Sequence, residues 1–472
     1  MKSNLRFQHV ILIIGCLLCC SLNRALAKHF GLSSLTYTHI SGNVYHFQFT
    51  YYQDCTGVTP QTTVTLNMHS YSCGVNQDVI INKPGQGELI TPICPQASSY
   101  CDGGQEPGIR KWVYEADVNI PGQCPDWIFS VYYCCRNAYF TNVQSPYEES
   151  YAEARLDNSM QDNSSPVIAN EAVMFLNQDQ DFHFNNGFFD PDNDSLSVAM
   201  VPAMMTANTW VTYTNGFSAQ QPVTSVPPVS FNSISGDLVI HPTAPEVSMM
   251  SFRVNEFRNG ALIGSITRDI GFYTLFTSSS AQPELTGVNG APHHIAYVLP
   301  GTELCFEIFS NDEDQSDSLF LSWNHGIPAA TFVSDFLKHP TGTFCWTPEL
   351  SDERSTPYFF TATIRDNWCP MNSVQTYSYA VYVTSDSSLM WMNTGIPERD
   401  DFMIYPNPSS GTLHFTASET IDMIRIYDHA GKLIIADKLR SSVYKIEEPE
   451  GIYLVEILFN DGRRLKQKII KK

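Results

Sequence analysis

The residues of this chain that are best suited to chemistry lie in two acidic loops. Both loops consist of carboxylate or amide side chains at short intervals: Asp190, Asp192 and Asp194 in the first, and Asn311, Asp312, Asp314 and Asp317 in the second. Oxygen ligands at such spacing can converge on Ca²⁺, which takes about six to eight of them. The sequence therefore predicts two calcium sites, which Asp269 or Asp366, at the ends of later strand-like runs, could complete.

Two other interpretations of these loops stay open at this point. Asp and Asn are good turn formers, so the loops could be solvated turns. Asp194-Ser195-Leu196 and Asp317-Ser318-Leu319 also resemble the Asp-Ser/Thr-aliphatic sequon of O-glycosylated proteins exported by Bacteroidetes, which would place sugars on the two serines. An EF-hand is not indicated, because neither loop has the Gly and the distant Glu of that motif.

The elements that must position these loops are predicted to be β-strands. Between Val44 and Tyr52, the aromatic residues Tyr45, Phe47, Phe49 and Tyr51 fall on alternate positions. This alternation is typical of a strand that buries one face. Similar short runs recur along the chain and helix-period stretches are scarce. The sequence therefore predicts an all-β fold.

The charge of the chain is strongly negative and unevenly distributed. The formal net charge is −21. Residues 28–393 carry 12 Lys and Arg against 36 Asp and Glu, a balance of −24, whereas residues 394–472 carry 12 of each. A negative surface disfavours nucleic acid and anionic membranes as partners and suits cation binding or solubility.

Cysteine usage indicates an oxidising compartment. Three of the 13 cysteines fall within the first 20 residues, and the other ten are disulfide candidates: Cys55, Cys73, Cys94, Cys101, Cys124, Cys134, Cys135, Cys305, Cys345 and Cys369. Seven of these lie early and three lie late, so either one bridge crosses between domains or each group keeps a free thiol. Metal binding by these cysteines is disfavoured, because a Cys-Cys pair without Cys-x-x-Cys is poor zinc spacing.

The first residues look like a secretory signal peptide. Lys2 and Arg6 precede an apolar run from Val10 to Cys20, and Ala25-Leu26-Ala27 forms a cleavage site. The run is too short to span a bilayer, and no other apolar stretch is long enough, so we expect no transmembrane span in the mature chain. Ile13-Ile14-Gly15-Cys16 also resembles a lipoprotein cleavage box, which would instead leave a lipidated cysteine.

Turn signals and composition divide the chain into seven segments. They are a signal peptide (1–27), a disulfide-rich β domain (28–155), a linker (156–165), a β-sandwich (166–280), a further β-sandwich (281–385), a second linker (386–399) and a C-terminal β domain (400–472). The first linker is assigned because it is polar and lacks periodicity. Arg258-Asn259-Gly260 is expected to join two neighbouring strands, since Gly suits the positive φ of a tight turn.

Segment 281–385 combines three motifs in order. The acidic loop is followed by Gly342-Thr343-Phe344-Cys345-Trp346-Thr347-Pro348 and then by an aromatic run that ends at Asp366. This series resembles the cadherin-like and putative Ig domains of bacterial surface proteins, and segment 166–280 matches more loosely because it lacks the Trp. The resemblance implies tandem Ig-like or cadherin-like β-sandwiches. With Asn255-Glu256-Phe257 and Arg268-Asp269, the chain also looks like gliding-motility-associated surface proteins of Bacteroidetes.

Segment 400–472 carries the most specific pattern. It opens with Tyr405-Pro406-Asn407-Pro408 and Gly411, continues with a Gly431-Lys432 turn and a Gly451-Ile452-Tyr453 strand, and ends on Lys471-Lys472. It resembles the type A C-terminal sorting domain of the Bacteroidetes type IX secretion system, in which these motifs are recognised by the export apparatus. The resemblance implies a small β-sandwich, the type IX machinery as a partner, and a passenger that is released or attached to surface lipopolysaccharide after crossing the periplasm.

Catalytic motifs are missing from the sequence. The chain has no Gly-x-Ser-x-Gly, no His-Glu-x-x-His and no phosphate-binding Gly loop. The sequence therefore predicts a secreted or cell-surface structural or adhesion protein, not an enzyme, with an extracellular glycan or protein as its ligand. The alternative that stays open is a secreted carbohydrate-active or proteolytic enzyme with an atypical site.

Overall fold

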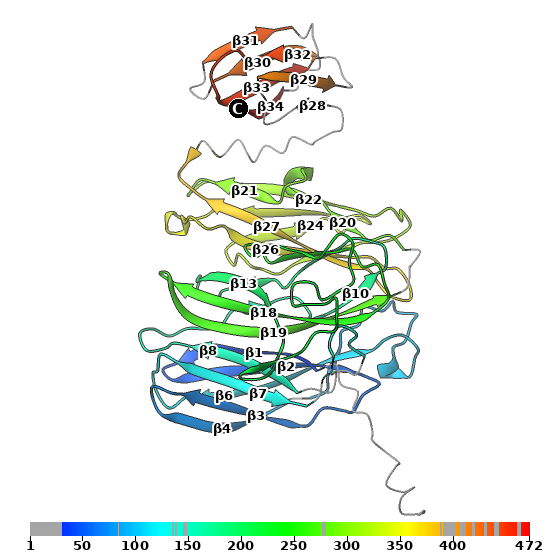
Figure 1. Ribbon diagram of the computed structural model, residues 1–472, viewed down its shortest axis with the longest axis vertical. Coiled ribbons are helices and arrows are strands. Elements are labelled where there is room, and N and C mark those ends of the chain that lie inside the picture. Colours follow the sequence, from blue (N-terminus) through cyan, green and yellow to red (C-terminus); the bar gives the residue numbers. More distant parts are fainter. Residues whose placement is uncertain are drawn as a thin grey trace, which may run out of the picture.

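The chain folds almost entirely into β-strands, as a computed structural model shows (Figure 1). The structure describes residues 31–387 and 389, apart from 84, 135, 137–138, 145–148 and 276–279, and residues 402–472, apart from 406–408, 410, 418–420, 429–431, 439–442 and 460–463. The predicted signal peptide, Cys135, Pro406, Asn407, Pro408, Gly431 and most of the 386–399 linker lie outside the described residues.

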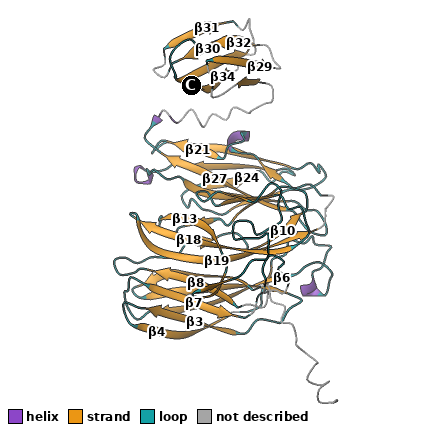
Figure 2. Cartoon of the chain, in the orientation of Figure 1, coloured by secondary structure: helices purple, strands orange, loops and turns teal. Residues whose placement is uncertain are grey.

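The predicted all-β class is confirmed. Helical segments in the described ranges are short 3-10 turns, including η1 (Tyr100–Asp102), η2 (Val288–Gly290) and η3 (Leu350–Asp352), and Figure 2 shows strands in every layer. None of the described helical segments is both long and apolar enough to cross a membrane.

The N-terminal strands form a ring around an aromatic core. Its members, in pairing order, are β1 (Leu32–Ser41), β2 (Val44–Asp54), β6 (Ile109–Asn119), β4 (Val75–Asn82), β3 (Thr63–Ser70), β7 (Trp127–Tyr133), β8 (Ser150–Leu156) and β19 (Ala261–Leu275), with β5 (Glu88–Leu89) beside β6. β19 pairs with β1 as well as with β8, so the ring closes. The predicted aromatic face of β2 is confirmed, because Tyr45, Phe47, Phe49 and Tyr51 are all 0% exposed.

The predicted second unit shares a β-sheet with this ring. β19 also pairs with β18 (Val247–Arg258), which pairs with β13 (Ser195–Val201), so one twelve-stranded sheet runs through both units. Their buried apolar side chains form a single cluster. The other strands of this region are β9 (Val167–Ile168), β10 (Val173–Asn177), β11 (Phe182–Asn185), β12 (Phe188–Phe189), β14 (Met204–Thr206), β15 (Thr209–Trp210), β16 (Ser230–Phe231) and β17 (Asp237–Ile240). The structure thus joins into one body what the sequence divided into two units.

The segment predicted as the first linker is packed within this body. Tyr37 N donates a hydrogen bond to Ser165 Oγ at 3.0 Å, and Cys124 N donates to Asn158 Oδ1 at 2.8 Å. The side chains of Asn158 and Ser165 therefore accept hydrogen bonds from backbone N–H groups that would otherwise be buried without partners. This explains why the two ends of a polar stretch without periodicity are buried, while residues 160–162 in its middle are exposed.

The predicted turn between β18 and β19 is confirmed. Arg258 pairs with Ala261, and between them Asn259 and Gly260 have φ of 52° and 81°. Both values lie in the left-handed region, which Gly and Asn adopt at the least cost.

The third unit is a sandwich with a core of its own. One sheet contains β20 (Glu284–Leu285), β22 (Leu304–Asn311), β25 (Thr341–Trp346) and β24 (Thr331–Ser334), and the other contains β21 (Ile295–Val298), β27 (Val374–Val383), β26 (Tyr358–Arg365) and β23 (Phe320–Trp323). Phe344 and Phe360 stack between the sheets with ring centroids 4.4 Å apart. On its outer side, Ser378 of β27 donates a hydrogen bond to Asp237 of the preceding body at 2.7 Å.

Disulfides hold these parts together. The bonds are Cys55–Cys101, Cys73–Cys124, Cys94–Cys369 and Cys305–Cys345, and Cys134 is also disulfide-bonded. Cys94–Cys369 joins the N-terminal ring to the third unit across 275 residues of sequence. The early and late groups of cysteines are therefore connected by a crossing bridge, one of the two arrangements that their odd numbers allow.

The C-terminal strands form a separate small sandwich. Its sheets are β28 (Phe402–Tyr405), β29 (Thr412–Ala417) and β32 (Val443–Lys445), and β31 (Leu433–Asp437), β30 (Ile421–Tyr427), β33 (Gly451–Phe459) and β34 (Arg464–Lys471). Leu413, Ile424, Val455 and Ile469 belong to its own buried cluster. Among the described strands, none of these pairs with a strand of the preceding units.

Candidate cation sites and the C-terminal domain

The second acidic loop meets the end of a later strand in a cluster of three carboxylates. Asp312 and Asp317 lie in the loop after β22, and Asp366 follows directly after β26. Each contributes one carboxylate oxygen to a group whose atoms all lie within 4.8 Å of one another. The three residues are 1%, 7% and 0% exposed. The strand ends of the sandwich therefore bring three buried acids together.

Hydrogen bonds satisfy only part of this cluster. Asp312 Oδ1 accepts Asp314 N at 2.8 Å, and Asp366 Oδ1 accepts the backbone N–H groups of Trp368 and Ser373 at 3.1 and 2.8 Å. The second oxygens, Asp312 Oδ2 and Asp317 Oδ2, are buried and have no hydrogen-bond partner within the structure. Burying a neutral polar group without a partner costs about 2–7 kcal/mol, and a charged oxygen costs more, so these atoms require a ligand or a proton.

The electrostatics of the cluster favour a cation. Burial raises the pKa of Asp366 to about 6, with Asp312 adding to the rise. Burial also raises the pKa of Asp312, and the charges of Asp317 and Asp314 raise it further. No Lys or Arg of the described residues forms an ion pair with any of the three acids. Three hard oxygen donors without a protein cation fit Ca²⁺, which prefers carboxylates.

The other residues predicted for this site lie outside the cluster. Asp314 Oδ2 accepts Ala281 N at 2.8 Å, in the segment that connects the two bodies. Asn311 is exposed at the end of β22, where it pairs with Glu284. Asp366, which the sequence suggested only as a completing ligand, is a full member of the cluster.

The first acidic loop forms a different arrangement. Asp190 Oδ1 accepts the N–H groups of Asp192 and Asp194 at 2.9 Å each, which folds the loop into a tight turn. Arg258 holds both oxygens of Asp194, with Nε at 2.9 and 3.0 Å and Nη2 at 2.5 Å from Oδ2. Glu256 joins Asp190 and Asp194 in a group of carboxylates within 4.8 Å. Arg258 therefore supplies the cation that the second cluster lacks.

The two remaining predicted ligands, Asp192 and Asp269, lie outside both carboxylate clusters. Asp192 Oδ2 accepts Ser164 N at 2.7 Å and lies 3.7 Å from Arg258 Nη2, but is not part of the carboxylate group. Asp269 forms a buried ion pair with Arg136, at 2.6 Å between Asp269 Oδ2 and Arg136 Nη1. Of the two proposed sequons, Ser195 is exposed and Ser318 is half-buried.

Glu256 is the residue of the first cluster that the sequence did not identify. It lies on β18, opposite Gly264 of β19, where a Cβ would come within 2.4 Å of Glu256 Oε2. A larger residue at position 264 would therefore force this carboxyl to move. Burial, together with the neighbouring Asp190, raises the pKa of Glu256 to about 10. A buried Glu more than sixty residues from its partners gives no local sequence signal.

Replacement of Glu256 by Gln should remove a pH dependence of stability. Because burial raises the pKa of Glu256 from an ordinary value of 4.5 to about 10, the folded state keeps a proton that the unfolded state releases; the stability of the protein is therefore highest below pH 4.5 and falls as the pH rises towards 10. Glu256→Gln should therefore raise the free energy of unfolding by about 2–4 kcal/mol at pH 8 and leave it unchanged near pH 4.5. Urea denaturation at several pH values measures this. Exposed Glu313→Gln is the control, and parallel pH profiles for Glu256→Gln and wild type would contradict the assignment.

The described part of the C-terminal domain places several sorting-motif residues close together. Gly411 has φ of 106°, and a Cβ there would lie 2.9 Å from Ile446 O. Lys471 Nζ donates hydrogen bonds to Ile446 O at 2.9 Å and to Glu448 O at 2.5 Å. Gly451 pairs with Lys471 across β33 and β34. The opening Gly, the Gly-x-Tyr strand and the basic end thus meet in one place.

Two further motif residues have structural roles. Tyr453 is 4% exposed and donates its hydroxyl hydrogen bond to Pro449 O at 2.5 Å. Lys432 N donates to Asp428 Oδ1 at 2.8 Å and closes the turn before β31. Tyr405 is the last residue of β28, paired with His414.

Comparison with known structures and proteins gives one informative match. One similar solved structure is that of the N-terminal four Ig domains of Dscam1 isoform 4.44: the sequence identity is 11%, the match covers 93% of this chain and 99% of that chain, and the TM-score is 0.18. Another is that of titin domains A168–A170: the sequence identity is 10%, the match covers 65% of this chain and 99% of that chain, and the TM-score is 0.17. TM-scores this low carry no argument. No curated protein matches the chain. Residues 403–472 match the family described as the secretion system C-terminal sorting domain, so this is a protein sorted by the type IX machinery to the cell surface or the exterior.

Proposed function

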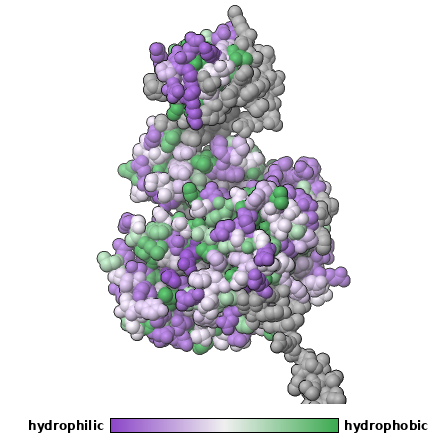
Figure 3. Space-filling model, viewed as in Figure 1, coloured by the Kyte–Doolittle hydropathy of each residue, from purple (hydrophilic) through white to green (hydrophobic). Residues whose placement is uncertain are grey.

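We propose that this protein is a secreted or cell-surface structural or adhesion protein, not an enzyme, whose modules are fixed to one another by Ca²⁺ bound at Asp312, Asp317 and Asp366. The sorting domain supports delivery to the outer surface. The formal net charge of −21 suits cation binding and disfavours nucleic-acid or anionic-membrane partners. Figure 3 agrees with a surface exposed to water, since hydrophilic residues cover much of the visible face.

The observation that carries this proposal is the position of the three-carboxylate cluster. Ser280 Oγ lies 3.4 Å from Asp366 Oδ2, and Ser280 O accepts Gln180 Nε2 of the preceding body at 2.9 Å. The cluster therefore adjoins the segment that connects β19 to the third unit. A Ca²⁺ ion held there would neutralise the acids and stiffen the junction. The first cluster is not included, because Arg258 and the raised pKa of Glu256 already limit its negative charge.

Cell attachment tests the adhesive role. A strain without this protein should lose much of its attachment to surfaces and to neighbouring cells in the presence of Ca²⁺, and a strain whose protein carries Asp317→Asn should be intermediate. Spreading on soft agar tests the association with gliding that the sequence suggested. Unchanged attachment and spreading in the deletion strain, or release of sugars or peptides from polymers by the purified protein, would contradict the proposed function.

A further inference from the structure

Two adjoining hollows lie on the outer face of the N-terminal ring. Their volumes are about 760 and 460 Å³, and they share Asn67, Ser130 and Tyr132. The floor consists of side chains of β3, β7 and β8; those of β3 alternate with buried residues, whereas all described residues of β8 except Arg155 are buried. We call this continuous hollow the ring groove. Each hollow lies within the range of roughly 300–1,000 Å³ that is usual for ligand sites, and together they form an extended surface.

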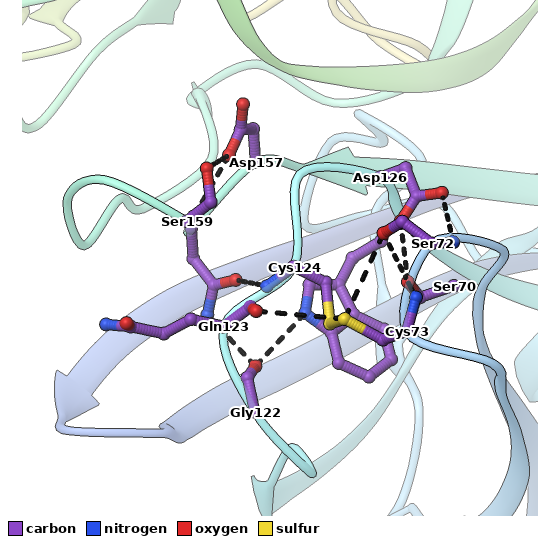
Figure 4. The surroundings of a disulfide bond; sticks show 11 residues. Ser70, Ser72, Cys73, Gly122, Gln123, Cys124, Asp126, Asp157 and Ser159 are labelled. Atoms are coloured by element: carbon purple, nitrogen blue, oxygen red, sulfur yellow. Dashed lines mark hydrogen bonds between the residues drawn. A yellow bond between two sulfur atoms is a disulfide. The ribbon is translucent and has the colours of Figure 1, made fainter.

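A braced loop presents an aromatic ring at one end of the ring groove. Tyr71, which is 77% exposed, follows directly after β3. Ser70 Oγ and Ser72 Oγ donate hydrogen bonds to Asp126 Oδ1 at 2.5 and 2.6 Å, and the next residue, Cys73, is bonded to Cys124 (Figure 4). These hydrogen bonds lower the pKa of Asp126 to about 2. Tyr71 is therefore exposed yet held in place, as an aromatic contact surface requires.

A second aromatic platform lies further along the floor. Tyr132 is 48% exposed on β7 and packs against Tyr151 with ring centroids 4.7 Å apart. Leu66 of β3 pairs with Val131, so Tyr132 lies opposite Thr65 of β3, which is six positions before Tyr71. Six residues of strand correspond to roughly 20 Å. The two exposed rings are thus separated by the length of a short oligomer.

Polar side chains fill the floor between the two rings. The strand register places Asp78, Asn67, Ser130 and Glu153 in one row across four strands. Asn67 Nδ2 donates to Asp78 Oδ1 at 2.8 Å. Glu153 Oε1 accepts Arg155 Nε at 2.7 Å, which fixes a guanidinium that is 48% exposed. Ser130 and Glu153 are only 4% and 2% exposed, so the groups that a ligand can reach here are the side chains of Asn67, Asp78 and Arg155.

The pairing and charge of the floor exclude several kinds of ligand. β3, β7 and β8 are each paired on both sides, so no strand edge is open for a peptide to add to the sheet. Asp78, Glu153 and the neighbouring Asp126 and Asp157 outnumber Arg155, which disfavours anionic polymers. A neutral ligand rich in hydroxyl groups, with apolar faces that stack on Tyr rings, fits both the polar row and its aromatic ends.

We propose that the ring groove binds a neutral oligosaccharide or polysaccharide, with Tyr71 and Tyr132 as stacking platforms and the side chains of Asn67, Asp78 and Arg155 as hydrogen-bonding partners for its hydroxyls. This assignment names the class of ligand for the adhesive role proposed above. It rests on that role only in placing the protein outside the cell, where it would meet the glycan. It is independent of the calcium cluster, which lies in the third unit. Binding in the groove can therefore fail while the surface role and the calcium site stand.

Affinity electrophoresis of the purified full-length protein tests the assignment. The gels contain a neutral β-glucan, a mannan or a xyloglucan, with alginate as the anionic comparison and gelatin as the protein comparison. We expect retardation by at least one neutral polysaccharide and by neither comparison. Tyr71→Ala and Tyr132→Ala should each weaken that binding about tenfold, as loss of a central aromatic contact typically does. Tyr100→Ala removes a ring that is 51% exposed outside the groove and should bind like wild type.

Each other outcome would overturn the assignment. Migration unaffected by all three neutral polysaccharides would show that the groove does not bind this class of ligand. Equal retardation of the two groove variants and wild type, with thermal melting showing all of them folded, would place the binding elsewhere. Retardation by gelatin that the groove variants abolish would make the ligand a protein.

Discussion

A chain that ends after residue 402 is expected to accumulate inside the cell envelope, folded, instead of reaching the cell surface. Residues 403–472 match the sorting family. Their buried cluster is separate from the clusters of the preceding units, so removing them exposes no core of the passenger. The expected loss is therefore one of delivery, close to complete, rather than of stability. Cell fractionation followed by immunoblotting measures it.

Two comparisons make this result specific. A periplasmic reporter to which residues 386–472 are appended should gain surface exposure, because the C-terminal sandwich carries its own fold. Non-reducing electrophoresis of the truncated chain should still show its disulfides, including Cys94–Cys369. Truncated protein at the wild-type level on the surface would refute the sorting role of this domain.

Removal of Ca²⁺ is expected to lower the melting temperature of the wild-type protein by about 5–10 °C. A ligand present at one hundred times its dissociation constant adds about 2.7 kcal/mol to the stability of the state that binds it, and a domain of this size shifts by about 2–4 °C per kcal/mol. Without the ion, Asp312 Oδ2 and Asp317 Oδ2 have no hydrogen-bond partner among the residues that the structure describes. Differential scanning fluorimetry with excess chelator, and then with restored Ca²⁺, measures the effect.

Variants within one loop distinguish the site from general charge effects. Asp317→Asn removes a cluster carboxylate and should abolish the response to chelator, whereas Asp314→Asn removes a carboxylate of the same loop that lies outside the cluster and accepts Ala281 N, and should keep it. Because the pKa of Asp366 is about 6, protons compete with the ion below that pH, and the chelator effect should shrink as the pH falls through 6. A response of equal size in both variants, or one independent of pH, would contradict the assignment.

Local patterns in the sequence predicted much of the structure. The alternation of Tyr45, Phe47, Phe49 and Tyr51 identified a buried strand face, since side chains in a strand alternate whatever the topology. Asn259-Gly260 identified a hairpin through its backbone preference. The second acidic loop and Asp366 were both indicated because each directly follows a recognisable strand.

Features that depend on long-range pairing could not be read from the sequence. β19 joins β8 and β1, and these two pairings between segments more than one hundred residues apart merge two predicted units into one core. Glu256 and Arg258 reach the first acidic loop only through the register of β18 and β13. That register places Arg258 beside the first loop. The sequence therefore could not show that an arginine pairs with the first carboxylate cluster and not with the second.

Isothermal titration of the metal-free protein with Ca²⁺ measures whether the three-carboxylate cluster holds the ion. We expect one site per chain that involves Asp312, Asp317 and Asp366, retained in Asp314→Asn and lost in Asp317→Asn. Absence of binding by the wild-type protein, or binding that Asp317→Asn leaves unchanged, would contradict this assignment.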